Sequence, residues 1–383
     1  MDFDRLKDFL DYYLPMLGVP GSDTVILKDH KEIFRHRSGY DNLKYRTPMR
    51  PDALHHMYSC TKIATCVAAL QLIERGEILI NDPLYVYFPE YRDIKVARRG
   101  PDGKTITERA KNPILIRHLF TMTSGLDYNI SRSSIDGVRA ATGGRCPTLD
   151  IVRALASDPL VSEPGERYCY GLSHDVLGGL VELISGVKLG DYMKKNIFDP
   201  LGIKDTTFTV GGHNYERIAC QYEYDSIGRC AHETPKDENI MRFGSEYQSG
   251  GAGLVSTVDD FVLLTDALAN GGVGRNGARI LSRAAVELLS TPSLDPVQQG
   301  YFEYGAQNAG YDYGLGVRVM RDPAKGGSLV PKGAFGWDGK KMCLSVSDPK
   351  NRIAIFHAEE ISGMNSIIIP RLLNVIYSCL EED

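Results

Sequence analysis

The pattern of hydrophobic and polar positions predicts strands near both ends of the chain. At the N-terminal end, apolar-rich segments 23–27 and 32–36 flank a polar turn, which predicts a β-hairpin. At the C-terminal end, 342–346 and 352–356 flank a second polar turn, and 315–320 has the alternation of a further strand. We therefore expect two hairpins, far apart in sequence, to contribute to one sheet.

Helical periodicity marks the start, the middle and the end of the chain. The segments with this pattern are 1–14, 59–76, 114–122, 149–156, 173–184 and 370–380. The order of elements predicts an α+β fold, with an antiparallel sheet built from both termini, flanked by helices, and a mostly helical domain inserted between. We place the sheet domain at 1–52 and 246–383 and the helical domain at 53–245.

Composition excludes several classes of partner. The 383 residues are 43% hydrophobic and 24% charged, with a net charge of −5 and no charge blocks, so neither nucleic acid nor an anionic membrane surface is an expected partner. The basic run 95–104 contains turn residues and predicts a solvated loop. The N-terminus lacks the apolar core of a signal peptide, and no apolar run reaches the roughly 18 residues of a membrane helix. We expect a cytoplasmic protein, and its oligomeric state stays open.

The cysteines do not form a metal-binding pattern. Eight are dispersed along the chain without a Cys-x-x-Cys pair, and the nearest approach to a ligand set, Cys220 with Cys230 and His232, is loosely spaced. We therefore expect reduced thiols, no metal and no cofactor.

A Ser-x-x-Lys sequence opens the helix predicted at 59–76. Ser59 and Lys62 would share one helical face with Cβ atoms about 5–6 Å apart, so that the lysine could take the proton that activates the serine. Backbone N–H groups of a first helical turn would also favour an oxyanion formed on Ser59. The same pattern at Ser185–Lys188 ends a helix, and at Ser347–Lys350 it enters a turn. The alternative is that Ser59 caps the helix and Lys62 lies on the surface.

Two further stretches contain groups suited to the same chemistry. Tyr170-Gly171-Leu172 precedes a helix, and a phenol beside a lysine can relay protons, although most tyrosines are simply packed. Gly336-Trp337-Asp338-Gly339 precedes a strand, and its glycines let the backbone approach a ligand. The alternative for this stretch is a glycine-rich turn with a buried indole.

These three motifs, in this order, resemble the serine β-lactamase and penicillin-binding-protein superfamily. The resemblance is nearest to class C-like β-lactamases and family VIII carboxylesterases, and it spans nearly the whole chain. The segments that link the motifs agree with it: 81–84, 88–91, 116–126, 200–208 and 249–257. The resemblance implies a β-lactamase/transpeptidase-like fold with the active site at the junction of the two predicted domains.

The resemblance also implies a role for individual residues. Ser59 would be the acylated nucleophile, Lys62 its proton partner and Tyr170 the base or relay, and either Lys62 or Tyr170 could take the first proton. The backbone N–H groups of Ser59 and Lys340 would form the oxyanion hole. Further residues are expected to contact the substrate: Trp337, Asp338, Gly339, Leu172 and Tyr128.

Two departures from the lactamase pattern guide the expected substrate. Leu172 stands where the second motif of the lactamases has Asn, and Trp337 stands where their third motif has a cationic residue that suits a substrate carboxylate. Both changes favour a neutral, partly apolar acyl group. Asp338, where a hydroxyl residue or Gly is common, has no evident reason in the sequence.

The expected function is therefore cleavage of small carboxylic esters by a serine hydrolase, through an acyl-serine intermediate. A β-lactamase, or a peptidase or amidase acting on D-amino acids, is the alternative within the same fold. A Ser-His-Asp triad within Ser173-His174-Asp175 is disfavoured, because adjacent residues of one helix cannot form a triad with one another. A non-catalytic relative that binds acyl ligands or self-assembles is the alternative from another class.

Overall fold

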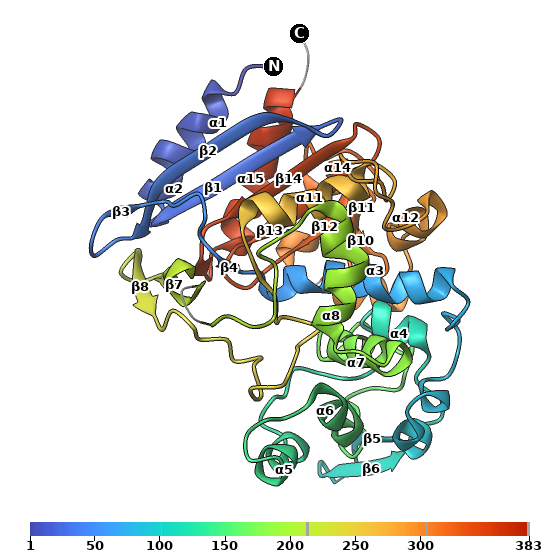
Figure 1. Cartoon of the computed structure of the whole chain (residues 1–383). Coiled ribbons are helices and arrows are strands. Elements are labelled where there is room, and N and C mark those ends of the chain that lie inside the picture. Colours follow the sequence, from blue (N-terminus) through green and yellow to red (C-terminus); the bar gives the residue numbers. More distant parts are fainter. Residues whose placement is uncertain (101, 212–213, 304, 381–383) are drawn as a thin grey trace.

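The computed structural model describes residues 1–100, 102–211, 214–303 and 305–380. Its largest element is an eight-stranded antiparallel sheet with the order β10-β11-β12-β13-β14-β1-β2-β3 (Figure 1). The strands are β1 (Gly21–Lys28), β2 (Lys31–Asn42), β3 (Thr47–Pro48), β10 (Tyr311–Tyr313), β11 (Arg318–Met320), β12 (Phe335–Asp338), β13 (Leu344–Asp348) and β14 (Ile353–Ala358). β1 pairs with β14, with Val25 opposite Phe356, so the prediction of one sheet built from both termini is confirmed.

Helices cover the central strands. α11 (Val258–Ala269) contacts β13, β14 and β1, while the N-terminal helix contacts α15 (Asn365–Leu380). The N-terminal helix runs through α1 (Asp4–Asp8), a π-helical turn (Phe9–Tyr13) and α2 (Leu14–Met16). All six residues of β14 are buried, as expected for a strand that is covered on both faces.

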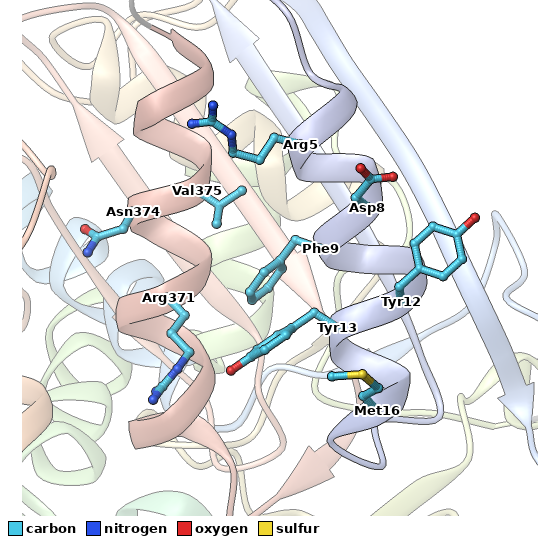
Figure 2. A pocket seen from close by; sticks show the side chains of 9 residues that line it. All are labelled: Arg5, Asp8, Phe9, Tyr12, Tyr13, Met16, Arg371, Asn374 and Val375. Atoms are coloured by element: carbon cyan, nitrogen blue, oxygen red, sulfur yellow. The ribbon is translucent and has the colours of Figure 1, made fainter.

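A shallow cavity of about 720 Å³ lies between the N-terminal helix and α15. Figure 2 shows Phe9, Tyr13 and Met16 projecting from the N-terminal helix, with Arg371 and Val375 on α15. The described residues that line it include no serine, cysteine or histidine, so it holds no nucleophile of the kind predicted from the sequence.

The long helix α3 (Thr61–Glu74) lies between the sheet and the helices of the middle of the chain (Figure 1). All its residues from Thr61 to Leu72 are buried, and it contacts β12 on one side and α7 on the other. The remaining α-helices are α4 (Ile116–Phe120), α5 (Ser133–Ala141), α6 (Thr148–Leu155), α7 (Ser173–Ser185), α8 (Leu189–Met193), α9 (Asp199–Leu201), α10 (Asn214–Arg217), α12 (Arg283–Leu289), α13 (Pro296–Phe302) and α14 (Pro323–Gly326). α3 is thus the element that joins the two parts of the fold.

Short strands in the middle of the chain were not predicted. The basic run expected to be a loop forms a hairpin, β5 (Lys95–Arg99) with β6 (Thr105–Arg109), because its turn residues connect two strands. A second hairpin, β7 (Gln221–Asp225) with β8 (Cys230–Thr234), continues into a parallel pairing of β7 with β15 (Ile361–Ser362). This pairing crosses the domain boundary that we placed at residue 245.

Two other predicted elements have different bounds. The strand expected at 315–320 begins only at Arg318, because Gly316 has a φ of +86° that breaks the extended conformation. The last helix begins at Asn365 rather than Pro370, and Pro370 lies inside it. Within the described residues, no helix has both the length and the apolar character needed to cross a lipid bilayer.

Candidate active site

Ser59 lies in a tight turn in front of α3 and not in the α-helix itself. The short strand β4 (His55–His56) pairs with β9 (Val255–Ser256) and leads into a 3₁₀ turn, Tyr58–Cys60, before α3 begins at Thr61. Tyr58 has a φ of +40°, a strained value for a residue other than glycine. Its hydroxyl donates to Gln221 Oε1 at 2.7 Å. The turn is therefore held in place, with Ser59 partly exposed.

Lys62 is the centre of a hydrogen-bond network. Although its side chain is fully buried, Nζ donates to Ser59 Oγ at 3.1 Å, to Tyr128 Oη at 2.9 Å and to the Gly251 carbonyl oxygen at 2.7 Å. An ammonium has three protons, so these three acceptors satisfy it completely. The predicted approach of Lys62 to Ser59 is present, and the alternative of a surface lysine is wrong.

Tyr128 contacts Lys62 directly. The sequence predicted this residue only as part of the substrate pocket, whereas the structure makes its hydroxyl oxygen the acceptor of a Lys62 hydrogen bond. Burial raises the pKa of Tyr128 well above its usual range, so the side chain is a neutral phenol, and a hydrogen bond with Ser59 opposes that rise. The ring packs edge-on against that of Tyr170, with centroids 5.3 Å apart.

Tyr170 lies beside Lys62 but presents its ring rather than its hydroxyl. Lys62 Nζ is 4.7 Å from the centroid of the Tyr170 ring, a cation–π contact. The Tyr170 hydroxyl instead accepts a hydrogen bond from Trp337 Nε1 at 2.9 Å. The structure therefore brings Tyr170 and Trp337 to the site, but the phenol bonded to the lysine belongs to Tyr128.

Asp338 forms an ion pair next to the site. Its carboxylate lies 2.7 Å from Arg318 Nη1 and accepts a hydrogen bond from Asn365 Nδ2 at 2.7 Å. The Arg318 guanidinium in turn lies 5.4 Å from the Trp337 ring centroid. Asp338 thus neutralises a buried arginine that packs against Trp337, and this explains a residue that the sequence left unexplained.

Gly339 is required by close packing. A Cβ atom at this position would lie 2.4 Å from the carbonyl oxygen of Met57, which is far shorter than any real contact. The glycine therefore lets the end of β12 touch the segment that leads to Ser59.

A cavity of about 320 Å³ opens beside Ser59. Of the predicted residues, Ser59, Tyr128, Tyr170 and Lys340 line it. Other lining residues were not predicted: Tyr58, Ile130, Ile240, Met241 and Ala252. Four residues predicted to contact the substrate are not among the lining residues: Leu172, Trp337, Asp338 and Gly339. Leu172 is fully buried, since the chain turns it into the core at the start of α7.

Comparison with known proteins decides the family. A family model described as Beta-lactamase matches residues 6–358. The chain belongs to the beta-lactamase family. It is 28% identical over 373 residues to the acyltransferase calJ of Penicillium decumbens, covering 90% of this chain and 84% of that one. It is also 28% identical over 357 residues to the esterase EstB of Burkholderia gladioli, covering 88% and 84%.

A solved structure has the same fold. The structure described as EstCE1, a hydrolase with promiscuous acyltransferase activity, superimposes with a TM-score of 0.78 at 23% identity, covering 98% of this chain and 97% of that one. The predicted β-lactamase/transpeptidase-like fold is confirmed, and the chain is an enzyme of that fold.

A buried carboxylate, that of Asp175, lies near Lys62, and the sequence did not single it out for the site. Asp175, in the first turn of α7, accepts hydrogen bonds from Tyr247 Oη at 2.8 Å and Ser249 Oγ at 2.6 Å. Burial raises the pKa of Asp175, while these hydrogen bonds and the positive charge of Lys62 oppose the rise. The carboxylate thereby anchors the segment 249–251, whose Gly251 carbonyl oxygen accepts from Lys62.

Two backbone N–H groups at the cavity are available to a ligand. Among the hydrogen bonds of the described residues, none has the N–H of Ser59 or of Lys340 as its donor. Both residues line the cavity. These two N–H groups could donate two hydrogen bonds to an oxyanion.

Proposed function

We propose that this chain is a serine hydrolase that cleaves carboxylic esters through an acyl intermediate on Ser59. The observation that carries the proposal is the 3.1 Å hydrogen bond from buried Lys62 Nζ to Ser59 Oγ, beside a cavity lined largely by apolar and aromatic residues. A nucleophile beside a base, facing a cavity of suitable size, is the arrangement that covalent acyl transfer requires.

In the proposed mechanism the Lys62 ammonium first gives one proton to solvent, so that Nζ has a free lone pair and can act as the base. Lys62 takes the proton of Ser59 Oγ as this oxygen attacks the ester carbonyl carbon, and the N–H groups of Ser59 and Lys340 bind the resulting oxyanion. When the tetrahedral species collapses, the bond to the alcohol oxygen breaks and that oxygen takes a proton from Tyr170. Tyr128 holds Lys62 in place during these steps. Water then attacks the acyl-serine, with the proton transfers reversed, and releases the acid.

The expected acyl group is neutral and at least partly apolar. Ile130, Ile240, Met241 and Ala252 supply apolar surface to the cavity. The Trp337 ring packs against the lining residue Tyr170, with centroids 5.6 Å apart. An apolar lining favours a ligand in proportion to the apolar area that leaves water. Lys340, exposed at the cavity, is the charged residue among the lining residues.

Acyl transfer to an alcohol other than water is a second candidate. The relative calJ is named as an acyltransferase, and EstCE1 is described as a hydrolase with promiscuous acyltransferase activity. The acyl-serine intermediate is the same in both reactions, which differ only in the nucleophile that attacks it in the second half-reaction. Hydrolysis in the presence of increasing concentrations of a primary alcohol separates them, since a transferase forms the new ester at the expense of the free acid.

The decisive experiment is the pre-steady-state release of p-nitrophenol from a p-nitrophenyl ester. We expect a burst of one equivalent in the wild type and no burst in Ser59→Ala. Ser185→Ala is the matched control, because Ser185 begins the other Ser-x-x-Lys sequence on a helix and lies at the far end of α7. A burst in Ser59→Ala, or no acylated Ser59 peptide in the mass spectrum of the quenched wild type, contradicts the proposal.

A substrate panel then separates the enzymes that share this chemistry. Esters, a cephalosporin and a D-amino-acid peptide are compared by kcat/KM on the same preparation. We expect the esters to be preferred, and a preference for the cephalosporin or the peptide would favour a β-lactamase or a D-peptidase instead.

A further inference from the structure

Three potential metal ligands meet on the β7–β8 hairpin, away from the acyl-transfer residues. Asp225 stands opposite Cys230 in the register of the two strands. His232 follows Cys230 by two residues, so it lies on the same face of the hairpin. One ligand atom from each of the three side chains lies within 4.8 Å of the others. A thiolate, an imidazole and a carboxylate together are donors that suit zinc.

The distances between these atoms match a tetrahedral metal centre. With Zn–S of about 2.3 Å and Zn–N of about 2.0–2.1 Å, tetrahedral angles separate the sulfur and nitrogen ligand atoms by about 3.6 Å. Cys230 Sγ lies 3.5 Å from His232 Nε2, close to the value for that pair. His232 Nε2 lies 3.7 Å from Asp225 Oδ2, against about 3.4 Å for a nitrogen and an oxygen ligand, and Asp225 lies within 4.8 Å of Cys230. The side chains therefore already have nearly the spacing that a bound ion imposes.

The turn of the hairpin supports the same geometry. Asp225 Oδ1 accepts a hydrogen bond from the Ile227 N–H at 2.8 Å, which orients the carboxylate and leaves Oδ2 toward the other two ligands. Gly228 packs against the cluster, since a Cβ atom there would lie 2.7 Å from Asp225 Oδ2 and 3.1 Å from Cys230 Sγ. A larger residue in the turn would enter the space between the carboxylate and the thiol.

We propose that Asp225, Cys230 and His232 form a zinc site that closes the tip of the β7–β8 hairpin, with solvent as the fourth ligand. His232 is 65% exposed, so an ion bound there would reach water on one side. The proposal corrects the sequence-based expectation in two ways. Asp225 takes the place of Cys220, whose Sγ accepts from Asn42 instead, and the chain would bind a metal after all.

The proposed site is independent of the proposed ester hydrolysis. At the base of the hairpin, Gln221 accepts a hydrogen bond from Tyr58, in the turn that holds Ser59. The three ligands lie toward the tip of the hairpin. We therefore expect metal binding to rigidify the hairpin without supplying chemistry to Ser59.

The first test is a titration of the metal-free full-length chain with Co²⁺. We expect one equivalent to produce the near-ultraviolet thiolate-to-cobalt charge-transfer band together with the visible bands of a tetrahedral ion, and Zn²⁺ to displace both. Cys230→Ser removes the charge-transfer band, and His232→Gln weakens Co²⁺ binding at least tenfold. Cys220→Ser, directly before the same hairpin, is the matched control and keeps wild-type binding. Absence of the band in the wild type, its persistence in Cys230→Ser, or its loss in Cys220→Ser overturns the proposal.

The second test reads the hairpin itself. Arg229 is exposed in the turn directly before Cys230, so trypsin can cut after it. We expect Zn²⁺ to slow this cut at least fivefold in the wild type and in Cys220→Ser, and to leave its rate unchanged in Cys230→Ser. Equal cleavage with and without Zn²⁺ in the wild type contradicts the proposed closure of the hairpin. Circular dichroism of each variant shows that it is folded before either test.

Discussion

The hydrogen bond between Lys62 and Tyr128 gives a prediction that the sequence alone did not make. Tyr128→Phe keeps the ring, including its edge-on contact with Tyr170, and removes only the oxygen that accepts from Lys62 Nζ at 2.9 Å. A hydrogen bond to a charged group contributes about 1.5–3 kcal/mol, and about 1.4 kcal/mol corresponds to a factor of ten in rate. We therefore expect kcat/KM to fall about 10- to 150-fold, because Lys62 is no longer held against Ser59.

Two esters of the same acid distinguish this role from that of Tyr170. A p-nitrophenyl ester has a leaving group that needs no proton, whereas an ethyl ester must be protonated as it departs. Tyr128→Phe should slow both esters by a similar factor, since it acts on the nucleophile and its base. Tyr170→Phe should slow the ethyl ester far more, because positioned general acids contribute about 10²–10⁴-fold.

The control for these variants is Tyr87→Phe. The Tyr87 hydroxyl donates to Asp82 Oδ2 at 2.6 Å, which is a comparable bond to a charged group outside the cavity. Its loss should leave both kcat/KM values within about twofold of the wild type. If Tyr128→Phe also stays within that range on both esters, the hydrogen bond does not position the base, and the proposed role of Tyr128 is refuted. If Tyr128→Phe shows the leaving-group dependence instead, the two tyrosines have exchanged roles.

The remaining predictions concern the backbone and the pH dependence of stability. Lys340→Met should keep kcat/KM for neutral esters within about threefold in a steady-state assay, because Lys340 is proposed to act through its main-chain N–H; a hundredfold loss would show that the ammonium is needed. Gly339→Ala should lower the melting temperature in calorimetry, since its Cβ would lie 2.4 Å from the Met57 carbonyl oxygen; an unchanged melting temperature would mean that the strand shifts freely. Burial lowers the pKa of His118 to about 4 from 6.5, and its Nδ1 accepts from the Leu115 N–H at 3.1 Å, so the fold favours the neutral ring. The stabilisation of the fold by the neutral His118 ring is complete above pH 6.5 and is lost as the pH falls towards 4. Between pH 7.5 and 5, the wild type should therefore lose about 2 kcal/mol more unfolding free energy than His118→Asn in urea titrations. Equal losses would contradict this.

The parts of the fold that the sequence predicted are those set by local pattern. The hairpin of β1 and β2 and the helix α7 with Gly186 at its end follow from periodicity and from residues that terminate helices. The short strands of β5 and β6 were missed because β5 is mostly polar and β6 is exposed throughout, so no apolar face marked them. The pairing of β7 with β15 joins segments more than a hundred residues apart, and no local pattern encodes it.

The contacts of the site can also be divided into those set by local sequence and those set by packing. Ser59 and Lys62 are three residues apart, so their contact follows from the geometry of one turn, and it was predicted. The bond from Lys62 to Tyr128 spans 66 residues and depends on how the loop after α4 packs. The role of Asp338 follows only from its ion pair with Arg318, on the neighbouring strand β11. The sequence could name these residues, but only the packed chain shows which of them touch.

A fully buried lysine would be costly unless its surroundings compensated for the lost water, and those surroundings explain the design of the site. The Lys62 ammonium loses its interactions with water and gains others in their place. These are hydrogen bonds to three oxygen acceptors, a contact with the face of the Tyr170 ring and attraction to the nearby Asp175 carboxylate. One of those acceptors is the nucleophile itself. The same contacts that make the buried charge tolerable therefore fix the distance between Lys62 and Ser59 before any substrate arrives, and little reorganisation is left for the transition state.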